Sequence, residues 1–493
     1  MNSNIIRQLN RQNTLDNMIP LSEFSGEEKI QELEKRGYRA GFTAESWKAE
    51  FPGIDPSLIL CPQSLLFPAS LIYFDPAHYI CFNTYIFDGK MLFSMPSPNG
   101  KRKDARGILA ELIARGMKDY EEKRYVDLLF PMTSEEGGGI AIRILREMLE
   151  REEPNPDLYS AFISVYTLCN CGANLLGETA LRRLVMCKSE KQKAETQKKL
   201  KKFPGDSLTV YRGQASESTP HEQACSWTTD INKAYFFASW RSADGSCILT
   251  GSVKKENIID YIDSRDEKEV LVVPGTVESV KKKGCIDWDT FQDIAAADMF
   301  DSRHRFPRES LARNIMKALD RVYEKGSAAD HDKEHSLRVA LLANFIYRMD
   351  VLMPLVHGEK VKYMKASGLL EDLSRAAVYH DAGRTDNTSN PEHGAAGYGK
   401  YRQDHGENKA VEFLTTYHCR PDEEAKEYCE KAFTGETAGS VWKAYCILKD
   451  ADALDRVRFG RGSGDFLDVN TLRSNTAKAL VPVAFRLVDA RFR

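Results

Sequence analysis

The chain has 493 residues, of which 42 % are hydrophobic and 29 % charged, and a net charge of −3 at pH 7. This length is too great for one ordinary hydrophobic core and predicts two to four domains. The near-neutral charge gives no reason to expect binding to nucleic acid or to an acidic membrane surface. No apolar run approaches the ~20 residues of a membrane span, and the opening MNSNIIRQLNRQ has no apolar signal region. We therefore expect a protein made in the cytoplasm, although export into a host cell as an effector stays open.

The N-terminal region, residues 1–103, begins with a polar, helix-forming stretch and becomes rich in β-formers. The segment SLIYFDPAHYICFNTYIFDGKMLFSM, from Ser70, predicts two or three strands with a turn at Asp88-Gly89. No motif in this region indicates a role.

Residues 104–200 read as helices, because apolar residues recur at i, i+3, i+4 and i+7. The lysine-rich stretch CKSEKQKAETQKKLKKF that follows Met186 is interrupted by glutamates and is typical of a solvated helix face. Short β segments separated by turns run from Ser207 to about Val280. From about Pro307 onward the pattern is helical almost to the end.

Three segments in the middle of the chain carry polar side chains in a fixed order. LTVYRG brings Arg212 to a strand end, SWTTD contains Ser226 and Thr228, and EKEVLVVP contains Glu267 and Glu269. An arginine at a strand end can hold a pyrophosphate through charge-assisted hydrogen bonds. Glutamates two residues apart on a strand point to the same face, where a carboxylate can stabilise a developing oxocarbenium ion. These groups suit the cleavage of NAD.

The set resembles the Arg, Ser-Thr-Ser, Glu-x-Glu signature of the arginine-type mono-ADP-ribosyltransferases. The resemblance implies that NAD is the cofactor and that Arg212, Ser226 and Thr228 bind it. It also implies that Glu269 is catalytic and that Glu267 directs a nucleophile of a protein acceptor. SWTT replaces Ser-Thr-Ser in this chain, which leaves the acceptor residue open.

Histidines and aspartates recur on the predicted C-terminal helices. DHDKEHSLRVA contains His331 and His335, AAVYHDAGR contains the adjacent His380 and Asp381, and LKDADALD contains Asp450. Helices that project imidazole and carboxylate inward can bind a divalent metal that activates water against phosphorus.

This run resembles the all-helical HD phosphohydrolase superfamily. The resemblance implies a metal site formed by His335, His380, Asp381 and Asp450, with His393 and His418 as ligands of a second site.

A closer resemblance is to the SidE-type phosphodiesterase domains, which act on ADP-ribosylated ubiquitin. It implies that His331 is a nucleophile, that His418 or His393 is the general acid, and that Glu392 is an orienting carboxylate. In this case no metal would be needed. The order of the modules differs, because SidE-type proteins place the phosphodiesterase before the transferase.

The expected fold class is therefore multidomain α+β. An α/β N-terminal segment precedes a mixed α+β transferase domain and an all-α HD domain. The ranges are 1–103 for the first segment, 104–285 for the transferase (helical lobe 104–205, β core 206–280), 286–306 for a linker and 307–493 for the HD domain.

The combination predicts sequential action. The transferase would attach ADP-ribose to a protein, with ubiquitin as one candidate, and the C-terminal centre would cleave the pyrophosphate to leave phosphoribose. A second hypothesis pairs a toxin-like transferase or NAD glycohydrolase with an independent metal-dependent nucleotide phosphohydrolase. A third holds that one of the two modules is only a binding platform.

Overall fold

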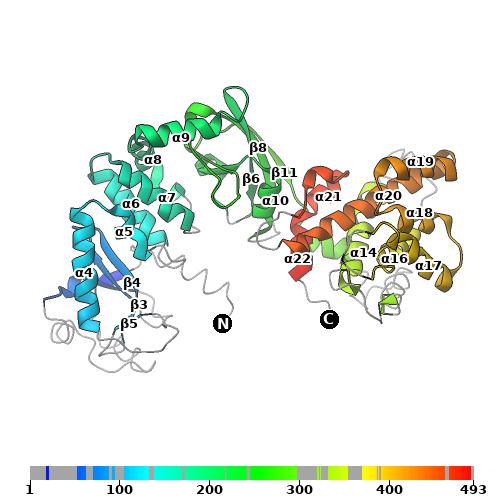
Figure 1. Cartoon of the computed structure of the whole chain (residues 1–493), viewed down its shortest axis with the longest axis horizontal. Helices are drawn as coiled ribbons and strands as arrows, with labels where there is room; N and C mark the ends of the chain where they lie inside the picture. The colour runs from blue at the N-terminus through cyan, green and yellow to red at the C-terminus, as the bar shows by residue number, and fades with distance from the viewer. Residues whose placement is uncertain are drawn as a thin grey trace. The chain divides into compact units, whose positions relative to one another are not determined.

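The structure is a computed structural model that describes residues 18–20, 53–62, 70–87, 92–94, 105–132, 138–168, 173–216, 218–240, 245–296, 319–320, 322–323, 331–353, 369–385, 387, 390–460 and 466–489. These residues are mixed α+β with a helical C-terminal region, which confirms the expected fold class at that level (Figure 1).

The chain divides into two compact units, called here the first and second unit. The first takes residues 1–208, 221–226 and 253–277, and the second takes residues 209–220, 227–252 and 278–493. The domain boundaries expected from the sequence stay predictions.

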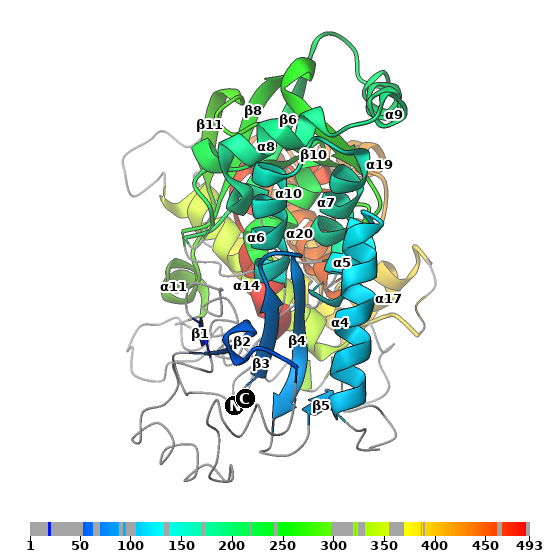
Figure 2. The ribbon, with the colours of Figure 1, turned by 90° about the vertical axis from the view of Figure 1, so that its left-hand side faces the viewer.

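An antiparallel sheet in the first unit has its strands in chain order. They are β1 (Met18–Pro20), β2 (Ile59–Pro62), β3 (Ser70–Asp75), β4 (Ile80–Phe87) and β5 (Leu92–Ser94). Three of these, β3 to β5, form in the segment where two or three were expected, and the predicted turn at Asp88-Gly89 lies outside the described residues. Helix α4 (Ala105–Glu121) runs beside β4 (Figure 2). A Cβ atom on Gly116 would lie only 2.8 Å from Ile80 Cγ2, so the glycine permits this close approach.

The other helices of the first unit bury apolar faces against one another. Ile140, Ile144, Leu145 and Met148 recur at helical spacing and are buried. The helices are α5 (Tyr125–Leu129), α6 (Gly138–Arg151), α7 (Pro156–Leu168), α8 (Gly177–Met186) and α9 (Glu190–Leu200).

Helix α9 carries the lysine-rich stretch, and a capping box between Ser189 and Gln192 starts it. Lys188, just before this helix, is not solvated. It is 7 % exposed and donates to Thr196 Oγ1 at 2.6 Å and to the Ile259 carbonyl oxygen at 2.8 Å. This lysine ties the start of α9 to strand β9 (Ile258–Ile262), which pairs antiparallel with β10 (Glu269–Val272).

Strands of the second unit lie in the order β11-β8-β6-β7. They are β6 (Ser207–Gln214), β7 (Ser226–Thr228), β8 (Cys247–Lys254) and β11 (Glu278–Gly284), and the ends of the first three extend into the first unit. Helix α10 (Ile231–Trp240) packs so closely on β6 that only a glycine fits at position 213. A Cβ on Gly213 would lie 1.9 Å from the Ala234 carbonyl oxygen.

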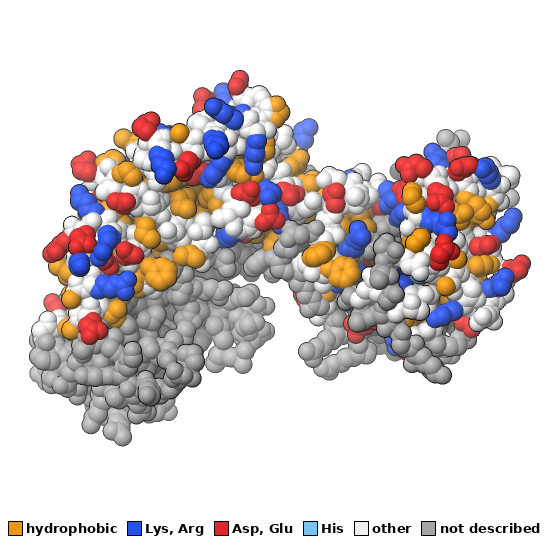
Figure 3. All heavy atoms as spheres, viewed as in Figure 1, with side chains coloured by type: hydrophobic (Ala, Val, Ile, Leu, Met, Phe, Trp, Pro, Cys, Tyr) orange, Lys and Arg blue, Asp and Glu red, His pale blue; other side chains and the backbone are white. Residues whose placement is uncertain are grey.

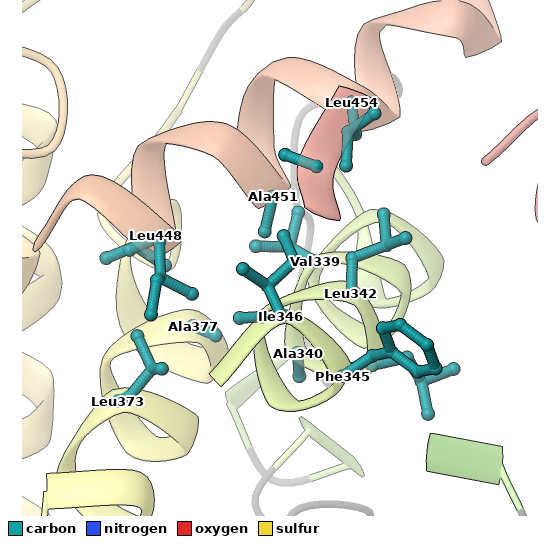
Figure 4. Close-up of a cluster of buried hydrophobic side chains, with 14 of the residues drawn as sticks. Val339, Ala340, Leu342, Phe345, Ile346, Leu373, Ala377, Leu448, Ala451 and Leu454 are labelled. Atoms are coloured by element: carbon teal, nitrogen blue, oxygen red, sulfur yellow. The ribbon is translucent and has the colours of Figure 1, made fainter. Parts of the chain in front are cut away.

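The helices of the second unit share one apolar core, part of which is drawn in Figure 4. In that view Val339, Leu342 and Ile346 of α14 (Lys333–Tyr347) face Ala377 of α16 (Leu369–Tyr379) and Leu448 and Ala451 of α20 (Gly435–Asp455). The helices are α11 (Trp288–Phe291), α14 (Lys333–Tyr347), α16 (Leu369–Tyr379), α17 (His393–His405), α18 (Lys409–Tyr417), α19 (Asp422–Ala432), α20 (Gly435–Asp455), α21 (Asn475–Ala479) and α22 (Val481–Asp489).

Residues 286–291 lie at the start of the range expected to be a linker, but they pack into this core. The Ile286 amide donates to the Ala479 carbonyl oxygen at 2.9 Å, and Phe291 is fully buried. On the face drawn in Figure 3, basic and acidic side chains are interspersed over the described surface of both units.

Candidate metal centre and candidate NAD site

The C-terminal histidines are held at the ends of helices. Asp332 caps α14 by accepting a hydrogen bond from the His335 amide at 2.9 Å, which places His335 in the first turn. His380 and Asp381 directly follow the last residue of α16. His393 begins α17, and His418 directly follows α18.

Asp381 lies at the centre of the cluster, and its Oδ2 atom faces one group of imidazoles. His331 Nδ1 lies 2.5 Å from it, His335 Nε2 3.3 Å and His380 Nε2 3.6 Å. Asp381 and His335 are almost fully buried, whereas the His331 side chain is 15 % exposed.

The other oxygen of Asp381, Oδ1, faces a second group. His393 Nε2 lies 3.1 Å from it, His418 Nε2 3.5 Å, and Arg384 Nε donates to it at 2.9 Å. One carboxylate is therefore shared between two pairs of buried imidazoles. The first pair is His335 with His380, and the second is His393 with His418.

In the first pair the hydrogen bonds fix the tautomers. His380 Nδ1 lies 2.8 Å from the Ala377 carbonyl oxygen, and His335 Nδ1 lies 2.7 Å from Asp455 Oδ2. Both oxygens accept, so both Nδ1 atoms donate and each Nε2 presents a lone pair unless it is protonated. The two Nε2 atoms are only 3.1 Å apart. Two facing lone pairs at this distance repel unless a proton or a metal ion lies beside them.

The second pair repeats the arrangement. His393 Nδ1 donates to the Asn390 carbonyl oxygen and His418 Nδ1 to that of Thr415, while their Nε2 atoms are 3.1 Å apart. Metal-bound histidines are commonly oriented in this way, through the ring nitrogen that does not bind the metal. The donor sets that could hold a metal ion are His335, His380 and Asp452; His331, His335 and Asp381; His380, Asp381 and His418; and His393, His418 and Cys419. The residues thus fit a divalent cation.

Without a metal, protons would take the place of the cation. Burial lowers the pKa of His335, but hydrogen bonds with Asp381 and Asp455 outweigh it and raise the pKa to about 9. Burial likewise lowers the pKa of His393, and its hydrogen bond with Asp381 raises the pKa to about 9. Burial lowers the pKa of His380 to about 3. His335 and His393 are thus protonated at neutral pH in the metal-free protein.

The predicted ligand Asp450 does not join the cluster. Its carboxylate accepts hydrogen bonds from the Arg473 and Ser474 amides at 2.9–3.0 Å and from the Arg473 guanidinium at 3.1 Å. Asp452, two residues further along α20, faces the histidines instead, with Oδ1 3.5 Å from His335 Nε2 and 3.9 Å from His380 Nε2. Its side chain is 35 % exposed, compared with 15 % for that of His331.

The predicted orienting residue Glu392 also lies apart from the cluster. It stands at the N-cap of α17 without capping it, its side chain is 70 % exposed, and its Oε1 lies 3.4 Å from Arg420 Nη2.

Glu269, the predicted catalytic glutamate, is buried in the first unit at the start of β10. Its Oε1 accepts hydrogen bonds from Ser226 Oγ at 2.5 Å and from the Tyr166 hydroxyl of α7. Its Oε2 is buried with no hydrogen-bond donor among the described residues, and Arg265 Nη2 lies 3.6 Å from it. The structure therefore brings together Ser226 and Glu269, and their role in an NAD site stays a prediction.

The other predicted NAD residues are placed as follows. Glu267 lies beside Arg265 in the loop before β10, with Oε2 2.9 Å from Arg265 Nη2. Arg212 lies on β6 in the second unit and donates to the Thr219 carbonyl oxygen at 3.3 Å, and Thr228 is buried on β7 and accepts from the Asp230 amide at 3.0 Å. Their joint role with Glu269 stays a prediction.

Sequence reasoning missed Asp452, Tyr166 and Arg265. Asp452 shares a face of α20 with Asp455, three residues on, but the sequence alone does not show which aspartate of DADALD faces the histidines. Tyr166 gave no signal, since its partner is 103 residues away along the chain.

Comparison of the chain with family models, with curated proteins and with solved structures gives no match. Among the helices of the described ranges, none is long and apolar enough to cross a membrane.

Proposed function

We propose that the C-terminal helices form a metal-dependent centre that hydrolyses phosphoesters or phosphoanhydrides. The observation that carries this proposal is that two pairs of imidazoles lie against the two oxygens of one buried carboxylate, that of Asp381. Neutral imidazole and carboxylate ligands suit divalent ions such as Mn²⁺, Fe²⁺ and Zn²⁺.

The residues divide into two sets around Asp381. His335, His380 and Asp452 would hold one cation, and His393 and His418 a second. A bound divalent cation polarises a phosphoryl oxygen and lowers the pKa of a bound water. Asp455 and the backbone carbonyls hold the imidazole rings in place for this. The substrate approaches from the side of His331 and Asp452, the two members of the cluster with more exposed side chains.

We further propose that the first unit contributes the catalytic carboxylate of an NAD-dependent mono-ADP-ribosyltransferase. This is supported by Glu269, whose Oε1 is fixed by two hydroxyls while its buried Oε2 has no donor in the described part of the chain. A carboxylate held in this way stabilises positive charge on a ribose as nicotinamide departs.

The two activities together suggest sequential action on a protein target such as ubiquitin. Attached ADP-ribose contains a pyrophosphate, which is the bond class that the C-terminal centre would cleave. Two sites on one chain also raise the effective concentration of the first product at the second site.

The test of the hydrolase uses the full chain, stripped with a chelator and reloaded with Mn²⁺, and bis(p-nitrophenyl) phosphate as the probe. Asp452→Asn is expected to lower metal content and to reduce hydrolysis by about 100-fold or more. Asp450→Asn is the matched control. It should lower the free energy of unfolding by about 1.5–3 kcal/mol, since Asp450 accepts from backbone and guanidinium donors, while the folded fraction still binds Mn²⁺. Equal metal binding by wild type and Asp452→Asn would contradict the proposal.

The sequential step is tested by intact-protein mass spectrometry after incubation with NAD and ubiquitin. Wild type should yield a phosphoribose adduct and Asp452→Asn an ADP-ribose adduct, while Glu269→Gln should yield neither. ADP-ribose as the product of wild type and Asp452→Asn alike would argue for an independent phosphohydrolase.

A second candidate mechanism is supported by His331. Its Nδ1 lies against Asp381, which leaves Nε2 as the nitrogen that can attack phosphorus. An Nε2–P bond would form as the P–O bond to AMP breaks, and water would then cleave the N–P bond. Full activity in excess chelator and an acid-labile N–P adduct of phosphoribose on His331, lost in His331→Gln, would favour this metal-free mechanism.

A further inference from the structure

The loop of residues 263–268, between β9 and β10, places a guanidinium between the two predicted catalytic glutamates. Arg265 Nη2 lies 2.9 Å from Glu267 Oε2 and 3.6 Å from Glu269 Oε2. The Arg265 side chain is 30 % exposed, whereas that of Glu269 is 5 % exposed, so one side of the guanidinium faces solvent and the other faces the buried acid.

The backbone of this loop is held in an uncommon conformation. Asp266 and Lys268 have φ values of 55° and 50°, in the left-handed region that non-glycine residues rarely adopt. Lys268 Nζ stabilises the loop by donating to Asp263 Oδ1 at 3.1 Å and Asp266 Oδ1 at 2.6 Å. The position of Arg265 is therefore set by the loop itself.

Glu269 is oriented so that one oxygen remains to act on a ligand. Ser226 and Tyr166 both donate to Oε1, whereas Oε2 receives no hydrogen bond from any residue that the structure describes and faces Arg265. In the proposed transferase, the anomeric carbon of the nicotinamide ribose lies near this oxygen, and the acceptor atom lies beside Glu267. The Nη2 atom of Arg265 lies beside both carboxylates.

We propose that Arg265 is an intramolecular acceptor of ADP-ribose, so that the chain modifies itself at this residue. The proposal rests on the transferase activity proposed above. The C–N bond between ribose and nicotinamide breaks and neutral nicotinamide leaves. A bond forms between the anomeric carbon and an Nη atom of Arg265, and Glu267 takes the proton that this nitrogen loses and passes it to water. The product keeps one positive charge on the substituted guanidinium.

The modification has a consequence for the site. The substituted guanidinium carries a bulky anionic group beside Glu267 and Glu269, and it blocks a second NAD molecule. Turnover on other acceptors should therefore slow as Arg265 becomes modified.

The experiment incubates the full chain with NAD, measures released nicotinamide, and maps adducts by peptide mass spectrometry, with ADP-ribose and phosphoribose both counted. We expect an adduct on Arg265 in wild type and in Arg182→Lys, a control on the exposed face of α8, and none at residue 265 in Arg265→Lys. Because the reaction is intramolecular, its rate constant should be the same after tenfold dilution of the protein at saturating NAD. A Glu269→Gln chain mixed with wild type should stay unmodified at Arg265.

Three outcomes would overturn the proposal. Nicotinamide release with Arg265 unmodified would refute self-modification and leave the transferase standing. Modification of the Glu269→Gln chain by wild type, at a rate proportional to protein concentration, would refute the intramolecular route. If the folded wild-type chain released no nicotinamide, both the transferase activity and this inference would be refuted.

Discussion

Helix α7 contributes two buried tyrosines, one heptad apart, to the strand pair of the first unit. Tyr166 donates to Glu269 on β10, and Tyr159 donates to Asp260 on β9. Burial raises the pKa of both hydroxyls, and the neighbouring carboxylates raise it further. Both tyrosines therefore stay neutral donors at neutral pH.

Only Tyr166 should affect the release of nicotinamide from NAD. Tyr166→Phe removes one of two donors from Glu269, and we expect nicotinamide release to fall by about 100-fold, the size of effect seen when one positioned hydrogen bond is lost from a charged active-site group. Tyr166 is a positioning residue, so kcat should fall more than KM changes. Steady-state kinetics of nicotinamide release measure this.

Tyr159→Phe is the matched control for this prediction. It should lower the free energy of unfolding by about 1–2 kcal/mol, as Tyr166→Phe does, because each removes a buried hydrogen bond. NAD turnover should be retained. Equal losses of turnover in the two variants would show that the tyrosines act only through stability.

At the scale of secondary-structure elements, two glycines let α17 approach the turn that carries His380 and Asp381, and a third lets it approach α18. A Cβ on Gly397 would lie 2.2 Å from the Tyr379 carbonyl oxygen, and one on Gly383 would lie 2.3 Å from that of His393. A Cβ on Gly394 would lie 2.5 Å from the Thr415 carbonyl oxygen. These backbone contacts bring the second imidazole pair within reach of the same carboxylate as the first.

Gly397→Ala should therefore separate the two halves of the centre. Its Cβ meets backbone, which cannot move aside as a flexible side chain can, so α17 must shift away from α16. We expect bound Mn²⁺ and hydrolysis of the phosphate probe to fall by at least about tenfold, as for a metal site with a disturbed supporting group. Metal analysis and the hydrolysis assay measure this.

Gly399→Ala tests whether the effect is local to the contact. A Cβ at Gly399 meets nothing within 4 Å, so alanine should raise the free energy of unfolding by about 0.5–1 kcal/mol through helix propensity. Metal binding should be kept. If Gly397→Ala behaved like Gly399→Ala, the glycine contact would have no role in forming the centre.

At the scale of the whole molecule, the two imidazole pairs predict a dependence of stability on pH. In the metal-free protein the pKa values of His335 and His393 are raised from 6.5 to about 9. A group with a raised pKa in the folded state stabilises fully below its ordinary pKa, and that stabilisation is lost as the pH rises through the folded value. The melting temperature in chelator should fall between pH 7 and pH 9.

With saturating Mn²⁺ the melting temperature should instead rise with pH, because metal ligands must be deprotonated and metal affinity therefore rises with pH. Thermal unfolding with and without metal measures both slopes. His393→Gln should flatten the slope in chelator. A melting temperature that rises with pH in chelator as well would contradict the proposed protonation of the imidazole pairs.

Local patterns predicted the helices, the strands from Ser70 and the residue types of both candidate sites. The adjacent pair His380-Asp381 could be selected because it stands at the end of an apolar helical pattern, and Ser226 and Glu269 because their order along the chain was informative. Contacts between distant segments could not be predicted in this way. The partners of Asp450 are backbone amides 23 and 24 residues away, and no local pattern distinguishes it from Asp452 until the hydrogen bonds are known.

The core of the second unit limits how this chain can be divided or recombined. Ala234, Tyr235 and Ile248 belong to the same apolar cluster as the C-terminal helices, Phe236 contacts the Phe485 ring, and the Val469 amide donates to Asn232. A gene fragment beginning after residue 306 would encode the histidines without the strands and helix that cover their scaffold. In evolution or in protein engineering, a crossover at that point would produce an incomplete fold, so β6, α10 and β8 must be inherited together with the helices that carry the histidine cluster.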